Sequence, residues 1–170
     1  MADMRTFIHR IDARDVIEYV NDEWVEFGAE NWDAESARAV VGTSLWEYVA
    51  TPAVKNLLQT VVARLRQTRS RVKLPYRCDS PAARRYMEME MEASAEGQVE
   101  FRSRTIREEE REPVYLLAQS EELATGVLLM CSWCKRVNVP PWMEVEEAVR
   151  QLELFSGPDV PGISHGLCDD

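Results

Sequence analysis

Period-two alternation of apolar and polar residues marks the middle of the chain. In residues 86–92, YMEMEME, methionines alternate with glutamates. The same alternation occurs on either side, in residues 71–78 and 98–106. Two shorter β-rich stretches, 6–11 and 15–20, open the chain. Because strands with one buried and one solvated face alternate in this way, the pattern predicts an antiparallel sheet.

Helical patterns fill the interval between the second and third of these strands. The clearest helix has Thr51 as its N-cap and Pro52 at its first position, where the missing N–H costs nothing. Two shorter helices are predicted before it, capped by Asn21 and by Ser44. The apolar stripe of the long helix has helical spacing and comprises Val54, Leu57, Leu58, Val61 and Leu65.

A boundary is predicted after the charged run REEERE, which ends just before Pro113. It divides the chain into residues 1–112 and 113–170. The second part contains one predicted helix, residues 142–155, with Pro141 near its start. The apolar face of that helix carries Trp142, Val145, Val149 and Leu152.

Charge and hydropathy narrow the classes of protein. The 170 residues carry 30 Asp and Glu against 20 Lys and Arg, a formal net charge of -10, which repels nucleic-acid phosphates. No apolar run approaches the roughly 20 residues that span a bilayer, and the first residues lack the apolar core of a signal peptide. We therefore expect a cytoplasmic protein, in which clustered cysteines indicate metal or redox chemistry more often than disulfides.

Three of the four cysteines and one of the two histidines form a spaced pattern near the end of the chain. Cys131 and Cys134 make a C-x2-C pair, and after 30 residues His165 and Cys168 repeat the spacing as H-x2-C. Two such turns can aim four donors at one tetrahedral Zn²⁺. The sequence thus predicts a structural zinc site formed by all four residues.

Other uses of these cysteines remain open. Cys131 and Cys134 can act as a redox pair, although Pro140 and Pro141 argue against the helix that follows a thioredoxin-type motif. Cys78 has no spaced partner and is expected to be a small buried side chain. His9 is interpreted as a half-buried histidine with satisfied hydrogen bonds. No phosphate-binding glycine loop and no catalytic triad is recognisable, so we do not expect an enzyme.

The order of elements resembles that of a PAS domain over roughly residues 5–110, in the segments YVNDEWVEFGAEN, VVGTSLWEYV and LPYRCDSP. The resemblance implies an α+β fold, with a five-stranded antiparallel sheet and helices on one face. It also implies a sensor or protein-interaction module that is often dimeric and sometimes holds a small ligand between sheet and helices. Haem and flavin occur in this family, but the sequence offers little for either. Residues that would line a ligand pocket, and that suit a plain core equally well, are Trp24, Phe27, Trp46, Tyr76 and Met89.

The tail, with CSWCKRV, WMEVEEAV and SHGLC, resembles a short cysteine-rich segment found beside sensory domains in bacterial signalling proteins. There the second half often reads H-G-x-C-P-x-C, whereas here Asp169 and Asp170 follow Cys168. The departure leaves two outcomes: either His165 completes the zinc site, or the site is open and its thiols can react with oxidants.

Two functional hypotheses follow. The first is a PAS-type sensory or protein-interaction module of bacterial signal transduction, with a structural zinc ion, no catalytic activity of its own, and a second copy or a signalling protein as partner. The alternative is a thiol-based redox regulator that uses Cys131 and Cys134. An enzyme with catalytic zinc ranks last, because the predicted ligand set leaves no open position.

Overall fold

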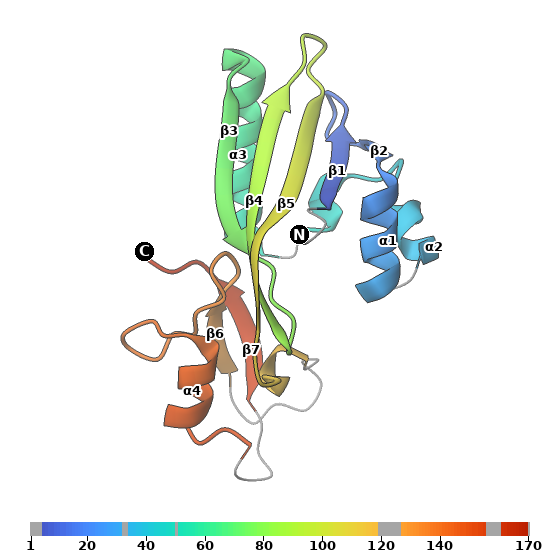
Figure 1. Cartoon of the computed structure of the whole chain (residues 1–170). Helices are drawn as coiled ribbons and strands as arrows, with labels where there is room; N and C mark the ends of the chain where they lie inside the picture. The colour runs from blue at the N-terminus through green and yellow to red at the C-terminus, as the bar shows by residue number, and fades with distance from the viewer. Residues whose placement is uncertain (1–4, 32–33, 50, 119–126, 156–160, 170) are drawn as a thin grey trace. The chain divides into compact units, whose positions relative to one another are not determined.

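A computed structural model describes residues 5–31, 34–49, 51–118, 127–155 and 161–169. Its largest element is a five-stranded sheet with strand order β2-β1-β5-β4-β3 (Figure 1). The strands are β1 (Thr6–Ile11), β2 (Ile17–Val20), β3 (Arg71–Arg77), β4 (Ala83–Ala93) and β5 (Val99–Glu110). The predicted α+β class with a five-stranded antiparallel sheet is confirmed.

Strand β1 occupies the interior of the sheet and pairs antiparallel with both β2 and β5. Its side chains alternate, so that Phe7, His9 and Ile11 are buried while their neighbours are partly exposed. On β5 the inward positions are Val99 and Phe101, and His9 pairs in register with Phe101. The expected alternation therefore places a histidine, rather than an apolar residue, at the centre of the buried face.

Helices α1 (Asp22–Asn31), α2 (Ala34–Ala39) and α3 (Pro52–Thr68), with a short 3₁₀ turn η1 (Leu45–Glu47), connect β2 to β3. The Asn21 side chain accepts a hydrogen bond from the Trp24 N–H at 3.1 Å, and Ser44 accepts one from the Trp46 N–H. Both predicted caps are confirmed. These caps satisfy backbone donors that have no partner within a first helical turn.

Helix α3 begins after Thr51 with Pro52 in its first turn, as predicted. Its buried residues are Leu58, Val62 and Leu65, and Leu57 is exposed. The predicted stripe is therefore right at Leu58 and Leu65, and Val54 and Val61 are partly buried; it is wrong at Leu57 and missed Val62. Helix α3 ends at Thr68, and its C-cap, Arg69, adopts a left-handed conformation with φ of 55°.

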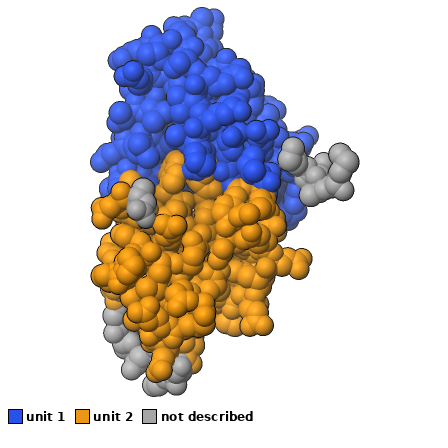
Figure 2. All heavy atoms as spheres, turned by 60° about the vertical axis from the view of Figure 1, so that its left-hand side comes forward, with its two compact units in different colours: residues 1–75, 87–106 blue, residues 76–86, 107–170 orange. Residues whose placement is uncertain are grey.

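The chain forms two compact units, coloured separately in Figure 2. The first comprises residues 1–75 and 87–106, and the second comprises 76–86 and 107–170. Strands β4 and β5 contribute residues to both units. The domain boundary predicted at 112/113 stays a prediction. The compact units are divided elsewhere, at 75/76, 86/87 and 106/107, so that each contains part of the β4–β5 hairpin.

The second unit has its own small core under a two-stranded parallel sheet of β6 (Val127–Cys131) and β7 (Gly162–Gly166). A 3₁₀ turn, η2 (Tyr115–Ala118), and helix α4 (Val145–Gln151) complete it. The buried residues that pack together are Val114, Leu116, Met130, Val137, Val145 and Ala148.

The helix predicted over residues 142–155 is shorter in the structure. Met143 pairs with Val137 in an isolated β-bridge, so the chain is still extended there, and Glu144 is the N-cap. After Gln151 the chain turns, with Glu153 and Phe155 at positive φ. Trp142 and Leu152 therefore lie outside the helix, because the apolar period cannot show where the backbone leaves helical angles.

Candidate metal centre and ligand cavity

The C-x2-C pair lies at the end of β6, in a tight turn. Cys131 is the last residue of the strand and is fully buried. Its carbonyl oxygen accepts a hydrogen bond from the Lys135 N–H at 2.9 Å, and Lys135 adopts a left-handed conformation with φ of 64°. The turn also receives support from Arg77, whose N–H donates to the Trp133 carbonyl at 2.9 Å. This geometry directs both cysteine side chains of the motif to the same region.

Cys168 joins them, because β7 runs parallel beside β6 and ends two residues before it. The sulfur atoms of Cys131, Cys134 and Cys168 all lie within 4.8 Å of one another. The Cys134 and Cys168 sulfurs are 3.6 Å apart, and all four cysteines of the chain carry free thiols. The structure therefore brings together three of the four predicted ligands.

Backbone N–H groups surround the Cys131 sulfur. It accepts hydrogen bonds from the N–H groups of Cys134 and Cys168, each at 3.4 Å. Burial alone would raise the pKa of the Cys131 thiol, but these N–H groups outweigh burial and lower the pKa below its usual value. Burial, together with the neighbouring sulfurs, raises the pKa of Cys134 to about 12. Cys131 therefore loses its proton more readily than Cys134, and a bound cation would favour the thiolate form of both.

The donor set fits a soft, tetrahedral metal ion. Three thiolates within one small volume suit Zn²⁺ in charge and in softness, and backbone N–H···S bonds commonly orient such ligands. The hard cations Ca²⁺ and Mg²⁺ require oxygen ligands instead. Three close cysteines can hold a metal ion, and these residues would be Cys131, Cys134 and Cys168.

His165 does not belong to this group. It is exposed in the middle of β7 and pairs in register with Met130, whereas Cys131 pairs with Gly166. Since successive side chains of a strand point to opposite faces, the side chains of His165 and Cys131 start on opposite faces. Asp169 is exposed, and Asp170 lies outside the described residues. His165 as the fourth ligand stays a prediction.

Cys78 lies in the same unit, one residue after the arginine that holds the C-x2-C turn. It is half-buried, and its N–H donates to the Arg85 carbonyl at 3.0 Å. Burial raises the pKa of its thiol despite the nearby charges of Lys135 and Arg85. Cys78 is not part of the close cysteine group among the described residues. The sequence analysis expected a small buried side chain, and the structure leaves Cys78 half-buried.

A network of buried ion pairs holds the second unit and escaped the sequence analysis. The Asp79 side chain is fully buried and binds the guanidinium groups of Arg77 and Arg111, which are 8% and 9% exposed. Arg77 also bonds Glu144 at 2.7 Å, and Arg84 bonds Glu146 at 3.0 Å. Arg77 and Asp79 are two residues apart, but Arg77 and Glu144 are 67 residues apart, so no local pattern relates the whole network.

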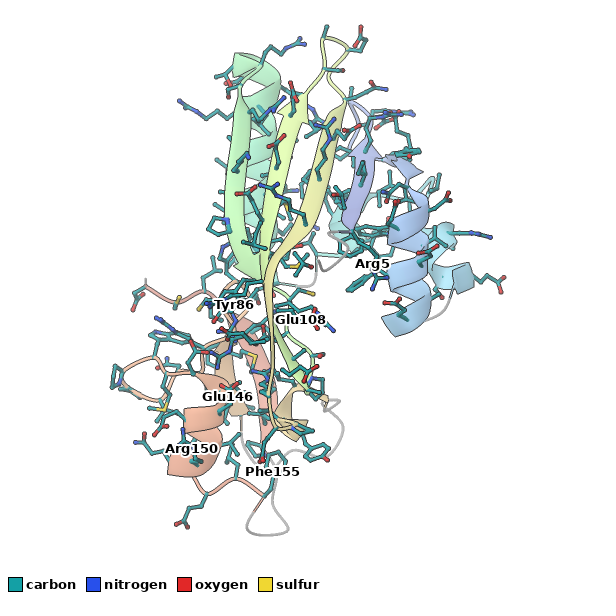
Figure 3. The ribbon with its side chains drawn as sticks, viewed as in Figure 1. Arg5, Tyr86, Glu108, Glu146, Arg150 and Phe155 are labelled. Atoms are coloured by element: carbon teal, nitrogen blue, oxygen red, sulfur yellow. The ribbon has the colours of Figure 1, made fainter. Side chains whose placement is uncertain are left out.

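Glu146 of this network and Arg150 extend from α4 and are labelled in Figure 3. Both line a surface hollow of about 580 Å³, together with Arg84 and Arg111. The hollow is lined by charges of both signs that form ion pairs with one another, although Arg84 Nε and Glu146 Oε2 have no hydrogen-bond partner among the described residues. It therefore has the properties of a solvated charge network.

A second cavity, of about 310 Å³, lies in the first unit beside β1 and the short helices. Its walls are mainly apolar, with His9 and Trp24 as the main nitrogen-bearing side chains. The lining includes His9, Ile17, Trp24, Val40, Leu45 and Tyr48. Its volume is at the lower end of the range for small-molecule sites in proteins, about 300 to 1,000 Å³.

Of the predicted pocket residues, the structure places Trp24 in this wall and the other four elsewhere. The ring of Phe27 packs on Phe7 with centroids 4.8 Å apart, and Trp46 donates its indole N–H to Asp15 at 2.7 Å. Tyr76 belongs to the second unit, where it lies near Trp133, and Met89 is a partly buried residue of β4. The cavity residues missed by the sequence analysis include His9, which was expected to have satisfied hydrogen bonds.

The chain matches no protein-family model, and no curated protein matches it. Among solved structures, it is similar to a sensory box sensor histidine kinase from Vibrio cholerae, with a TM-score of 0.41 and 13% identity. That match covers 60% of this chain and 82% of the other. The fold assignment rests on the strand order and register of the chain itself. No helix among the described residues is long and apolar enough to cross a membrane.

Proposed function

We propose that the chain is a PAS-type sensory or protein-interaction module of bacterial signal transduction, without catalytic activity of its own. The observation that carries this proposal is the largely apolar cavity of about 310 Å³ between β1 and the helices that follow β2. A module of this kind binds a small molecule in the cavity and passes the signal to a second copy or to a signalling protein. The proposed location is the cytoplasm.

The second part of the proposal is a structural zinc ion that fastens the C-terminal unit. Its support is that the sulfur atoms of Cys131, Cys134 and Cys168 lie within 4.8 Å of one another, at or just after the ends of β6 and β7. The core of this unit is small, and a metal that links β6 to the residues after β7 would hold these two segments together. Cys131, Cys134 and Cys168 would supply three ligands; His165 stays the proposed fourth, and its side chain would have to turn toward them from the opposite face of the sheet.

Native mass spectrometry of the full chain, purified without chelators under reducing conditions, tests both parts. One zinc per chain and a dimer, or a retained organic ligand, are the expected results. A Cys134→Ser variant should lose the zinc, while the matched Cys78→Ser variant should retain it, because Cys78 lies outside the close group. A metal-free wild-type chain would overturn the zinc proposal. A zinc-bound monomer that retains no ligand and captures no partner would overturn the sensory proposal.

The alternative is a thiol-based redox regulator, and one observation favours a specific version of it. The sulfurs of Cys134 and Cys168 lie 3.6 Å apart, so the redox pair can include Cys168 as well as the sequence pair Cys131 and Cys134. Oxidation would join the sulfurs of Cys134 and Cys168 in a disulfide, releasing two protons and two electrons to hydrogen peroxide, which becomes two waters. Peptide mapping after peroxide treatment distinguishes the hypotheses: a Cys134–Cys168 disulfide at low peroxide supports redox regulation, and intact zinc-bound thiols support a structural site.

A further inference from the structure

The metal centre of the second unit offers three sulfur donors and no other ligand atom beside them among the described residues. The sulfurs belong to Cys131, Cys134 and Cys168, and no described histidine, aspartate or glutamate has a ligand atom within 4.8 Å of all three. The His165 side chain starts on the opposite face of the sheet from that of Cys131. Structural zinc sites almost always have four ligands in a tetrahedron. The described residues therefore supply one donor fewer than such a site uses.

Backbone hydrogen bonds bring these sulfurs together. The Ser132 N–H donates to the Gly166 carbonyl at 2.8 Å, which continues the pairing of β6 with β7 beyond Cys131. The N–H groups of Cys134 and Cys168 both donate to the Cys131 sulfur at 3.4 Å. Because these bonds join the C-x2-C turn to the segment after β7, the fold itself determines the arrangement of the three donors.

The spacing of the sulfurs fits an ion that lies among all three. Sulfurs that are each about 2.3 Å from a shared ion, the length of a Zn–S bond, lie about 4.0 Å apart when the ion is in their plane. The Cys134 and Cys168 sulfurs are 3.6 Å apart, and both lie within 4.8 Å of the Cys131 sulfur. Three-coordinate binding therefore requires only small movements of these side chains.

The surroundings of the site tolerate an ion of single positive charge. Three thiolates with a monovalent ion retain more negative charge than three thiolates with Zn²⁺, so a nearby cation and access to water both favour that complex. The Lys135 ammonium donates to the Ser132 carbonyl at 3.0 Å, which places a positive charge beside the turn. Cys134 and Cys168 are half-buried rather than enclosed.

We propose that the three cysteines form a three-coordinate thiolate site for Cu⁺, and that Cu⁺ displaces zinc from it. Soft thiolate ligands select Cu⁺ as well as zinc, and three of them complete the coordination of Cu⁺. The Cu⁺ complex therefore does not need His165, whereas closed zinc coordination does. The inference rests on the proposed metal centre and assigns a second ion to that same site, through which the second unit would respond to copper.

One equivalent of Cu⁺, added in the absence of oxygen to the full chain as purified, tests this proposal. The reductant must contain no thiol, so that only the protein supplies sulfur. Native mass spectrometry should show one copper per chain and release of any zinc, and X-ray absorption at the copper edge should show three sulfur neighbours. A nitrogen neighbour, more than one copper per chain, or a chain that retains no copper after gel filtration would overturn the proposal.

Four variants locate the ion by competition with a chromogenic Cu⁺ chelator. Cys134→Ser and Cys168→Ser each remove a ligand and should weaken Cu⁺ binding at least about tenfold, since loss of a residue that only orients a ligand already costs about 10- to 100-fold in metal affinity. Cys78→Ser removes a thiol outside the close group and should bind Cu⁺ as the wild type does. His165→Ala, at an exposed position, should also retain Cu⁺ affinity while weakening zinc binding. Equal losses of Cu⁺ affinity in His165→Ala and Cys134→Ser would contradict three-coordinate binding.

The same preparations separate failure of this inference from failure of the proposed function. Zinc content and oligomeric state of the purified chain report the proposed function before any copper is added. A zinc-bound dimer from which Cu⁺ displaces no zinc would overturn only the copper site. A metal-free purified chain that binds one Cu⁺ through three sulfurs would overturn the zinc proposal and support this one.

Discussion

The two compact units of this chain surround their buried polar groups with different kinds of neighbour. In the second unit, Asp79 is fully enclosed but bonded to two arginines, and the Cys131 sulfur accepts two backbone N–H groups. In the first unit, the buried nitrogens of His9 and Trp24 have no partner within the part of the chain that the structure describes. The partners in the second unit are charged side chains and backbone groups, although Arg84 Nε and Glu146 Oε2 also lack a hydrogen bond, whereas the His9 imidazole packs against aromatic rings.

This contrast predicts that metal removal affects one unit far more than the other. Structural zinc contributes about 10 to 16 kcal/mol to the folding of small zinc-finger peptides, so chelation should unfold much of the second unit. Hydrogen exchange should show lost protection in β6 and α4, with β1 and α3 unchanged. Cys134→Ser should reproduce the effect, and Cys78→Ser should not. Equal loss of protection in both units would show that the metal does not act locally.

The buried ion pairs give the next largest expected effect. Asp79→Asn removes the carboxylate that binds Arg77 and Arg111, and breaking a buried pair costs about 3 to 5 kcal/mol. We expect about 3 kcal/mol in denaturant unfolding, because Glu144 and Glu146 still bond these arginines. Glu30→Gln, which removes an exposed pair with Arg5, is the control and should cost under about 1 kcal/mol. Similar costs for the two variants would refute the special role of Asp79.

The smallest expected effect is the loss of folding stability that His9 causes at acid pH. Burial lowers its folded-state pKa to about 4 from 6.5, so between these values the unfolded chain binds more protons than the folded one. Stability due to the neutral ring is thus complete above pH 6.5 and is lost as the pH falls toward 4. We expect about 2 kcal/mol less stability of the first unit at pH 5 than at pH 7.

His9→Leu should remove this component of the pH dependence and leave the contribution of the carboxylates. The measurement is a series of denaturant unfolding curves, followed by a signal from the first unit, for the wild type and the variant at both pH values. If the two proteins lose the same stability, His9 is already solvated or partnered in the folded state.

The sheet could be predicted from the sequence because alternation is a local property. The run YMEMEME and its neighbours show which residues share a face, and one buried face requires that alternation. The caps at Asn21 and Ser44 were likewise predictable, since a cap acts within four residues. The end of α4 was not, because Glu153 and Phe155 adopt positive φ that their residue types do not favour.

The functional sites were predictable only in part. The spacing of Cys131 and Cys134 indicated a shared site, and the position of Cys168 became definite only through the parallel pairing of β6 with β7. The same register separates His165 from Cys131, which spacing alone could not show. Asp79 and its arginines, and the unsatisfied nitrogen of His9, depend on residues far apart in the chain, so they required the tertiary structure.

The sharing of the β4–β5 hairpin bears on how this protein can be divided or recombined. The chain passes between the two units three times, after Pro75, after Tyr86 and after Ile106. A cut at residue 112 would therefore leave residues 76–86, including Arg77 and Asp79, on the wrong fragment. A chimera that transplants the cysteine-rich residues 113–170 must therefore also carry residues 76–86 and 107–112, which belong to the same compact unit.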